Sequence, residues 1–268
     1  MVSTFGSVTG KLARHAALVA ALVLAGCSSV AEDETAGWDA QKLYSEAKSL
    51  MSKGGYDQAI KLYEKLEARY PYGRYAQQAQ LDTAYAYYKS GEPDLAILSA
   101  ERFIKLHPNH SDVDYAYYLK GLANFNEDLG VLGKVVDKDL TQRDPRASLE
   151  AFDAFRELIE RFPNSKYVAD SRLRMQYLVN TLAAHEIHVA RYYYRRGAYI
   201  AAVNRCQSVI TRYPNAPSHE EALLLLTASY DKLGLETLRD DTGRILRQNF
   251  PNSQYFSKGT TDWWKHWN

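Results

Sequence analysis

The sequence has almost no cysteine and none of the short motifs that mark common enzymes. Of its 268 residues only Cys27 and Cys206 are cysteines, and Cys206 lies at helical spacing among apolar residues, which predicts a buried structural thiol. No glycine-rich nucleotide loop, G-x-S-x-G elbow or C-x-x-C pair occurs. His185 and His188 flank Glu186, but the zinc-protease motif needs histidines four residues apart and these are three apart. We therefore expect no catalytic residues, no metal site and no bound cofactor.

An excess of charge is also lacking, as is a hydrophobic run long enough to cross a bilayer. Lysine and arginine number 33 against 32 acidic residues, a formal net charge of +1. A nucleic-acid-binding protein usually has a basic face or a high pI, so we expect no nucleic-acid partner. The apolar run at residues 16–25 is much shorter than the ~20 residues of a membrane-spanning helix.

Residues 1–26 instead have the features of an export signal peptide. Lys11 and Arg14 precede the apolar run, and small residues end it. The ending LAGC (residues 24–27) resembles the bacterial lipobox, whose cysteine receives an N-acyl diacylglycerol lipid and becomes the first residue of the mature protein. The alternative is an ordinary signal peptide followed by an unrelated cysteine. We predict lipidation of Cys27, a flexible tether over residues 27–38 and, because Ser28 and not aspartate follows the cysteine, anchoring in the outer membrane.

What the sequence does contain is a repeated helical pattern. Five times an aromatic residue is followed by proline, and in four of the five by asparagine as well. The prolines are Pro71, Pro108, Pro163, Pro214 and Pro251, at spacings of 37, 55, 51 and 37 residues. Two spacings are near the tetratricopeptide period of about 34 residues, and the longer two fit that repeat with an insertion. We predict an all-α protein, a helical solenoid of five tetratricopeptide-type helix–turn–helix repeats.

The two longer repeats contain extra residues of different kinds. The third is interrupted at residues 130–143 by a stretch with glycines and mixed charge, and the fourth keeps a helical period over residues 166–196 without glycine or proline. The latter is either one long helix or two helices joined by a kink. We assign repeats one to three to residues 39–165 and repeats four and five to residues 166–268. The tryptophan-rich tail (residues 263–267) either caps the last helix, which we favour, or docks on a partner.

Tyrosines are concentrated in the first helix of several repeats. Three occur within residues 85–88 and three within residues 115–118. They cannot all point inward, because neighbouring residues on a helix differ by about 100°. They either pack against the next repeat or line a groove suited to an extended peptide, and we expect at least one of each cluster to face such a groove.

Several of these segments together resemble the BamD family, called ComL in some bacteria. They are YPYGRYAQQAQLD (residues 70–82), AYAYYK (84–89), RDP (143–145), FPNS (162–165) and AVNR (202–205). The resemblance covers residues 38–252 and the lipobox. It does not extend to the insertion or the tail, so nothing is inferred for them.

The resemblance implies a non-catalytic scaffold lipoprotein of the outer-membrane β-barrel assembly (BAM) complex, lipid-anchored at the periplasmic face of the outer membrane. Its C-terminal repeats would bind a POTRA domain of BamA through Arg205, Asn204 and Arg196, alongside other BAM lipoproteins. Its N-terminal repeats would receive targeting peptides of unfolded outer-membrane β-barrel proteins. The candidate groove residues are Tyr72, Tyr75, Gln78, Tyr85 and Tyr88.

Two alternatives stay open. Arg205 could instead form an ordinary surface ion pair, which contributes little to stability. The ComL name also points to a peptidoglycan-associated or competence lipoprotein that organises cell-wall enzymes or DNA uptake, and the repeat pattern alone does not separate this function from the first.

Overall fold

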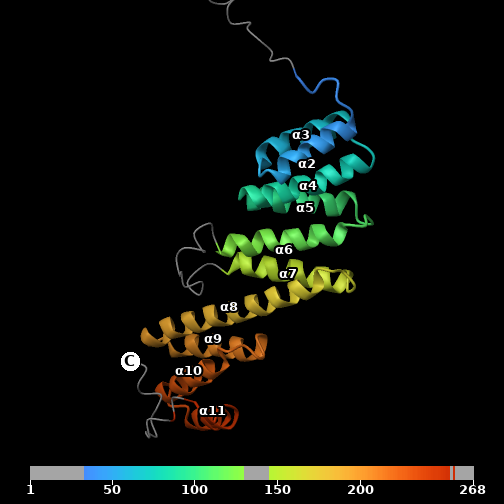
Figure 1. The fold of residues 1–268 in the computed structure, drawn as a ribbon. Coiled ribbons are helices and arrows are strands. Elements are labelled where there is room, and N and C mark those ends of the chain that lie inside the picture. The colour runs from blue at the N-terminus through green and yellow to red at the C-terminus, as the bar shows by residue number, and fades with distance from the viewer. Residues whose placement is uncertain (1–32, 130–144, 254–255, 257–268) are drawn as a thin grey trace, which may run out of the picture.

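The computed structural model describes residues 33–129, 145–253 and 256, and over these ranges the chain forms ten helices and no strand. The helices are α2 (Ala40–Ser52), α3 (Tyr56–Arg69), α4 (Arg74–Ser90), α5 (Pro93–Leu106), α6 (Val113–Leu129), α7 (Arg146–Arg161), α8 (Val168–Arg195), α9 (Tyr199–Arg212), α10 (His219–Lys232) and α11 (Glu236–Asn249). Consecutive helices pair, and the five pairs stack into an elongated array (Figure 1). The predicted all-α solenoid of five helix–turn–helix repeats is confirmed. The predicted signal peptide, Cys27, the insertion and the tryptophan-rich tail lie outside the described residues.

Glycine and proline residues determine where the helices end. The turns inside repeats one, two, four and five contain Gly54, Gly91, Gly197 and Gly234, each at a φ between 70° and 86°, which other residues rarely adopt. The second helix of every repeat ends one residue before the aromatic residue that precedes the repeat's proline, and that aromatic residue is its C-cap. Proline excludes the helical conformation from the residue before it, so the predicted stops are confirmed.

Small residues allow the two helices of a repeat to approach closely. Ala59, Ala96, Ala151 and Ala202 occupy equivalent positions on α3, α5, α7 and α9, and all four are fully buried. Large side chains such as Tyr63, Phe103 and Phe155 fill the space beside them. The first helices of neighbouring repeats also touch, in the pairs α2–α4, α4–α6 and α8–α10. The core is therefore thin and continuous along the stack.

Helix α8 is a single helix of 28 residues, which rules out two helices joined by a kink. At 1.5 Å per residue it is about 42 Å long and crosses the middle of the array (Figure 1). In its first half Leu178 packs with Phe125 and Phe155 of repeat three. In its second half Ile187 and Tyr194 pack with α9 and α10. Repeats three and four therefore share α8, and the predicted boundary between residues 165 and 166 falls just before the helix that joins the two halves.

The described part of the predicted tether, residues 33–38, is fixed against α3. Lys65 Nζ donates to the Asp33 carboxylate at 2.7 Å, and Arg69 donates to the same carboxylate and to the carbonyl of Thr35. The Tyr70 hydroxyl donates to the carbonyl of Trp38 at 3.1 Å. The contacts of the first repeat thus include residues that precede α2, from Asp33 onward.

The last helix that the structure describes, α11, has charged side chains on its outer side. On α9, the side that meets α10 contains Val203, Gln207 and Ile210. The prolines that end repeats four and five are 37 residues apart, so the equivalent positions on α11 are Asp240, Arg244 and Arg247. All three are exposed. Leu238 and Ile245 of the same helix are also exposed, at 45% and 41%, so the outer side of α11 carries both charged and apolar side chains.

Candidate functional site

Four of the five predicted groove residues share one face of α4. Tyr75, Gln78 and Tyr85 follow at steps of three and seven residues, Tyr88 lies three residues beyond Tyr85, and all four are half-buried. The rings of Tyr85 and Tyr88 are 6.4 Å apart. Tyr72 is not part of this face. It lies in the loop between α3 and α4, and its side chain is 90% exposed.

A buried carboxylate, Asp82, lies at the centre of this face, and sequence reasoning assigned it no role. Asp82 is 7% exposed and accepts hydrogen bonds from the hydroxyls of Tyr44 at 2.9 Å and Tyr63 at 3.3 Å. Lys48 Nζ lies 3.2 Å from the same oxygen, and Gln78 Nε2 lies 3.4 Å from the other. A buried charge needs such partners to offset its lost hydration. The sequence did contain a signal for this burial. Asp82 follows Leu81 and lies three residues after Ala79, so it interrupts a stripe of residues that helical spacing places on the buried side.

The surroundings of Asp82 change the acidity of its tyrosine partners. Burial, followed by the negative charge of Asp82, raises the pKa of Tyr44 and of Tyr63 well above its usual range. Both hydroxyls therefore stay protonated and remain donors to the carboxylate at physiological pH. This face of α4 is thus fixed in place by contacts with α2 and α3.

Aromatic rings continue from this face along the first helices of the next repeats. Tyr44 of α2 lies 5.5 Å from Tyr75, and Tyr115 of α6 packs in the cluster that contains Tyr85 and Tyr88. Tyr118 stacks on Tyr167 at 4.6 Å, just before α8 begins. The row therefore crosses repeats one to three and reaches the start of repeat four.

The far end of this row carries a second charged group. The Tyr118 hydroxyl donates to Asp170 at 2.7 Å, and Arg174 Nε donates to the same oxygen at 2.6 Å. Burial and the bond to Asp170 raise the pKa of Tyr118 to about 12. Tyr117 points the other way and is buried against Phe162. In the cluster at residues 115–118, Tyr117 therefore lies on another side of α6 than Tyr115 and Tyr118, whose rings pack against neighbouring repeats. That at least one tyrosine of each cluster faces a peptide groove stays a prediction.

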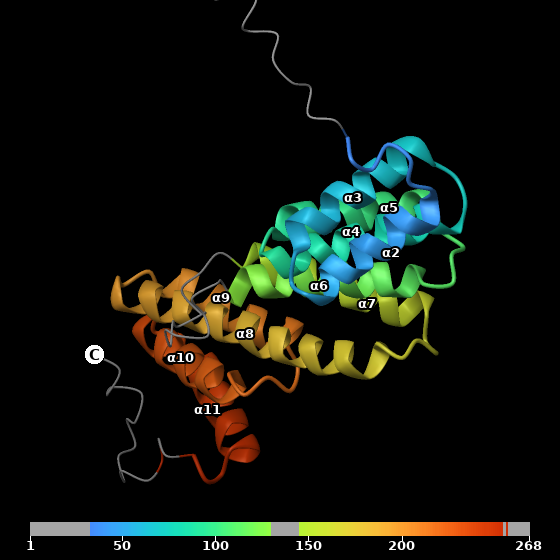
Figure 2. The same ribbon diagram turned by 45° about the horizontal axis from the view of Figure 1, so that its top comes forward.

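The first helix of repeat five offers no comparable face. In α10, residues 222–230 are all buried, whereas α4 and α6 keep half-buried tyrosines along one side. A helix covered on all sides is part of a core. Within the described residues, the half-buried aromatic row therefore runs from repeat one to the start of α8 and has no counterpart on α10, which lies beside α9 and α11 in the stack (Figure 2).

The three residues predicted to bind BamA occupy two separate places. Arg205 of α9 pairs with Glu186 of α8, with Nη1 3.0 Å from Oε2, and its side chain remains 43% exposed. This hydrogen bond raises the pKa of Arg205 above its already high value. Asn204 is exposed beside it. Arg196 caps the C-terminal end of α8 over the ring of Tyr192, ten residues or about 15 Å along the helix from Glu186.

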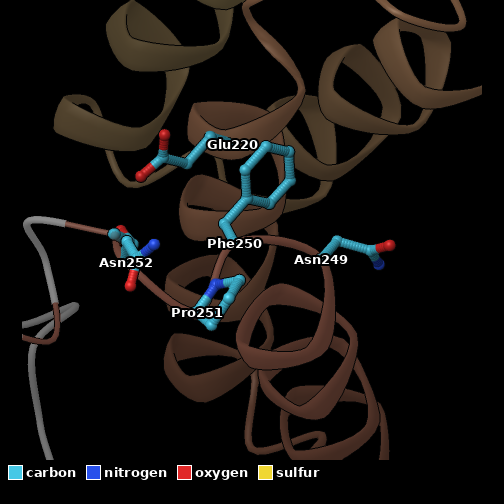
Figure 3. A pocket seen from close by; sticks show the side chains of 6 residues that line it. Glu220, Asn249, Phe250, Pro251 and Asn252 are labelled. Atoms are coloured by element: carbon cyan, nitrogen blue, oxygen red, sulfur yellow. The ribbon is translucent and has the colours of Figure 1, made fainter.

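Two pockets of the described surface lie at corners where a repeat ends at its proline. One, of about 370 Å³, is lined by Glu220, Asn249, Phe250, Pro251, Asn252 and Ser253, and Figure 3 shows Phe250 and Pro251 between Glu220 and Asn249. Another lies at the equivalent Pro108–Asn109 corner. Among the residues that the structure describes, no three His, Cys, Asp or Glu side chains gather as a metal site would require. In the same residues no helix is both long and apolar enough to span a membrane.

Comparison with known proteins gives one consistent family. Residues 37–246 match the family model YfiO, described as an outer membrane lipoprotein. The outer membrane protein assembly factor BamD of Neisseria meningitidis serogroup A is 49% identical over 237 residues, which cover 87% of this chain and 89% of that protein. The protein of the same name from Vibrio cholerae is 36% identical over 232 residues, covering 87% and 96%. A crystal structure of MamA aligns with a TM-score of 0.38 at 20% identity, over 82% of this chain and 94% of that one, and adds nothing to the argument.

Proposed function

Because this chain belongs to the BamD family of outer-membrane lipoproteins, we propose that it is a non-catalytic scaffold of outer-membrane β-barrel assembly. Its curated relatives are named assembly factors, which agrees with the expectation that the chain is no enzyme. In this proposal Cys27 carries the lipid that anchors the chain at the periplasmic face of the outer membrane. Its partners are BamA, other BAM lipoproteins and unfolded β-barrel proteins.

The N-terminal repeats receive an extended segment of an unfolded β-barrel protein. The observation that carries this proposal is the contrast between α4, with a half-buried row of tyrosines around a fixed carboxylate, and α10, which is buried on every side. Tyrosine rings offer apolar contact area with little loss of side-chain entropy, and their hydroxyls bond to peptide groups. Tyr75, Gln78, Tyr85 and Tyr88 are the contact residues, and Asp82 keeps their helix in register with α2 and α3.

The C-terminal repeats bind a POTRA domain of BamA through Arg205 and Asn204. The bond to Glu186 restricts the Arg205 side chain, so less rotamer entropy is lost when a partner carboxylate binds the exposed part of the guanidinium. Arg196 adds a second point of contact if the bound surface extends about 15 Å along α8. The closed core of α8, α9 and α10 makes this half a rigid platform.

A pull-down from detergent-solubilised outer membranes tests this function, comparing wild type, Arg205→Glu and Arg156→Glu. Arg156 is the matched control, because it too is partly exposed and paired with a carboxylate, that of Asp153 on its own helix. We expect BamA with the wild type and with Arg156→Glu, and its loss with Arg205→Glu. Retention of BamA by all three would remove Arg205 from the interface. Recovery of cell-wall enzymes in place of BamA would favour the alternative function in peptidoglycan organisation or competence.

A further inference from the structure

The first described residues of the chain contact the C-terminal end of α3, and what this implies rests on the proposed lipid at Cys27. Asp33 is held by Lys65 and Arg69, the latter the last residue of α3. The bond from Lys65 keeps the pKa of Asp33 well below its usual range, so the carboxylate stays charged. Six residue steps separate Cys27 from Asp33, and at about 3.5 Å per residue a fully extended chain spans no more than about 20 Å. Asp33 must therefore stay within about 20 Å of the lipid attachment point, and it holds the C-terminal end of α3 close by through its contacts with Lys65 and Arg69.

Aromatic and cationic side chains gather at this same end of α3. The Tyr70 hydroxyl bonds the backbone of Trp38, and the ammonium of Lys42 lies 4.6 Å from the centre of the Trp38 ring. Two residues beyond Tyr70, the side chain of Tyr72 is the most exposed large hydrophobic among those the structure describes. Arg74, also exposed, follows at the start of α4. We call Trp38, Lys42, Tyr70, Tyr72 and Arg74 the anchor-end patch. In Figure 1 and Figure 2 the first described residues, before α2, and the α3–α4 connection lie at the same end of the first repeat.

We propose that the anchor-end patch rests on the lipid surface, with Tyr72 in the headgroup region. Tryptophan and tyrosine prefer the membrane–water interface, where the ring is shielded and the polar atom stays wet, and lysine and arginine attract anionic headgroups. A lipid with several acyl chains anchors a protein without further help. The patch therefore contributes orientation: the first repeat lies against the membrane, and the stack extends from it into the periplasm. This assigns Tyr72, which is separate from the α4 face, to lipid instead of the peptide groove.

A fluorescent label placed in the loop tests the contact in the acylated full-length mature protein. Lipidation consumes the thiol of Cys27, and Cys206 is buried with its pKa raised to about 12, so Tyr72→Cys supplies one reactive thiol. Ile200→Cys is the matched control, because Ile200 is also an exposed apolar residue but lies at the start of α9, three repeats away. Each variant is labelled with an environment-sensitive dye and reconstituted in vesicles of phosphatidylethanolamine and phosphatidylglycerol that contain a lipid with a spin label near the headgroup.

We expect the dye at position 72 to lose most of its fluorescence to the spin-labelled lipid, and the dye at position 200 to keep it. Equal fluorescence at both positions in protein that floats with the vesicles would overturn the membrane contact and leave the anchor intact. Protein that does not float would overturn the lipid anchor itself, and the inference with it. A dye at position 72 that responds to an added β-barrel peptide and not to the spin label would return Tyr72 to the peptide groove.

Discussion

Replacing Gly121 by alanine should destabilise the solenoid, whereas the same replacement at Gly243 should stabilise it. Both glycines lie inside helices, Gly121 in α6 and Gly243 in α11. In a helix interior alanine is favoured over glycine by about 1 kcal/mol, so propensity alone predicts a gain at both positions. The two positions differ in what surrounds them.

At Gly121 a methyl group has no room. An added Cβ would lie 2.6 Å from Cδ1 and 2.9 Å from Cζ of Phe155, whereas non-bonded carbon atoms pack at about 3.5–4.0 Å. Phe155 is fully buried and its ring is held by Tyr118 and Phe125, so it cannot swing away freely. Overpacking a core costs about 1–3 kcal/mol, and contact with several ring atoms favours the upper end. After the propensity gain, we expect a net loss of about 2 kcal/mol.

At Gly243 the nearest side-chain atom to an added Cβ is Thr227 Cγ2 at 3.8 Å, an ordinary contact. The propensity gain is then retained, and we expect up to about 1 kcal/mol of stabilisation. Urea unfolding followed by circular dichroism gives the free energy of unfolding of both variants and of the wild type. An unchanged slope of that free energy against urea concentration shows that the denatured state is the same in all three. A Gly121→Ala variant as stable as wild type would refute the tight approach of α6 and α7. A lower free energy of unfolding for Gly243→Ala than for the wild type would refute the claim that helix propensity decides the outcome at this position.

Two further predictions concern the tyrosine row. Asp82→Ala removes the acceptor of two tyrosine hydroxyls, one of them on fully buried Tyr63, and should lower the free energy of unfolding by about 2–4 kcal/mol, against about 1 kcal/mol for Tyr44→Phe. Equal losses in urea unfolding would contradict a central role for the carboxylate. Stability should also fall as the pH rises above about 10, because the unfolded chain releases tyrosine protons there while Tyr44, Tyr63 and Tyr118, with raised pKa values, hold theirs. Below that pH this contribution is intact. A free energy of unfolding in urea that stays constant between about pH 9 and about pH 11 would count against it.

The sequence predicted the features that depend on neighbouring residues in the chain. Proline and the aromatic residue before it end each second helix, and glycine at positive φ makes four of the turns, so the repeat number could be read directly. The shared face of Tyr75, Gln78 and Tyr85 follows from helical spacing in the same way.

Features that depend on which helices pack against each other could not be predicted from the sequence. Leu173 fits the apolar period of α8 but is 73% exposed, because the buried stripe is chosen by α7 and α9. The burial of Asp82 depends on donors from α2 and α3, up to 38 residues away. The separation of Arg196 from Arg205 depends on α8 continuing without a kink past Glu186.

Because α8 packs against both repeat three and repeat four, it restricts where repeats can be gained or lost during evolution. Repeat proteins commonly gain or lose units when a segment encoding one helix pair is duplicated or deleted, and the neighbouring pairs close over the join. Deleting α8 with α9 would uncover Phe155 and Leu122 of repeat three, which the first half of α8 covers. Keeping α8 and deleting α9 would leave Ile187 and Ala190 without the neighbour they pack on. Changes of repeat number should therefore be tolerated toward the ends of the array and selected against at its centre.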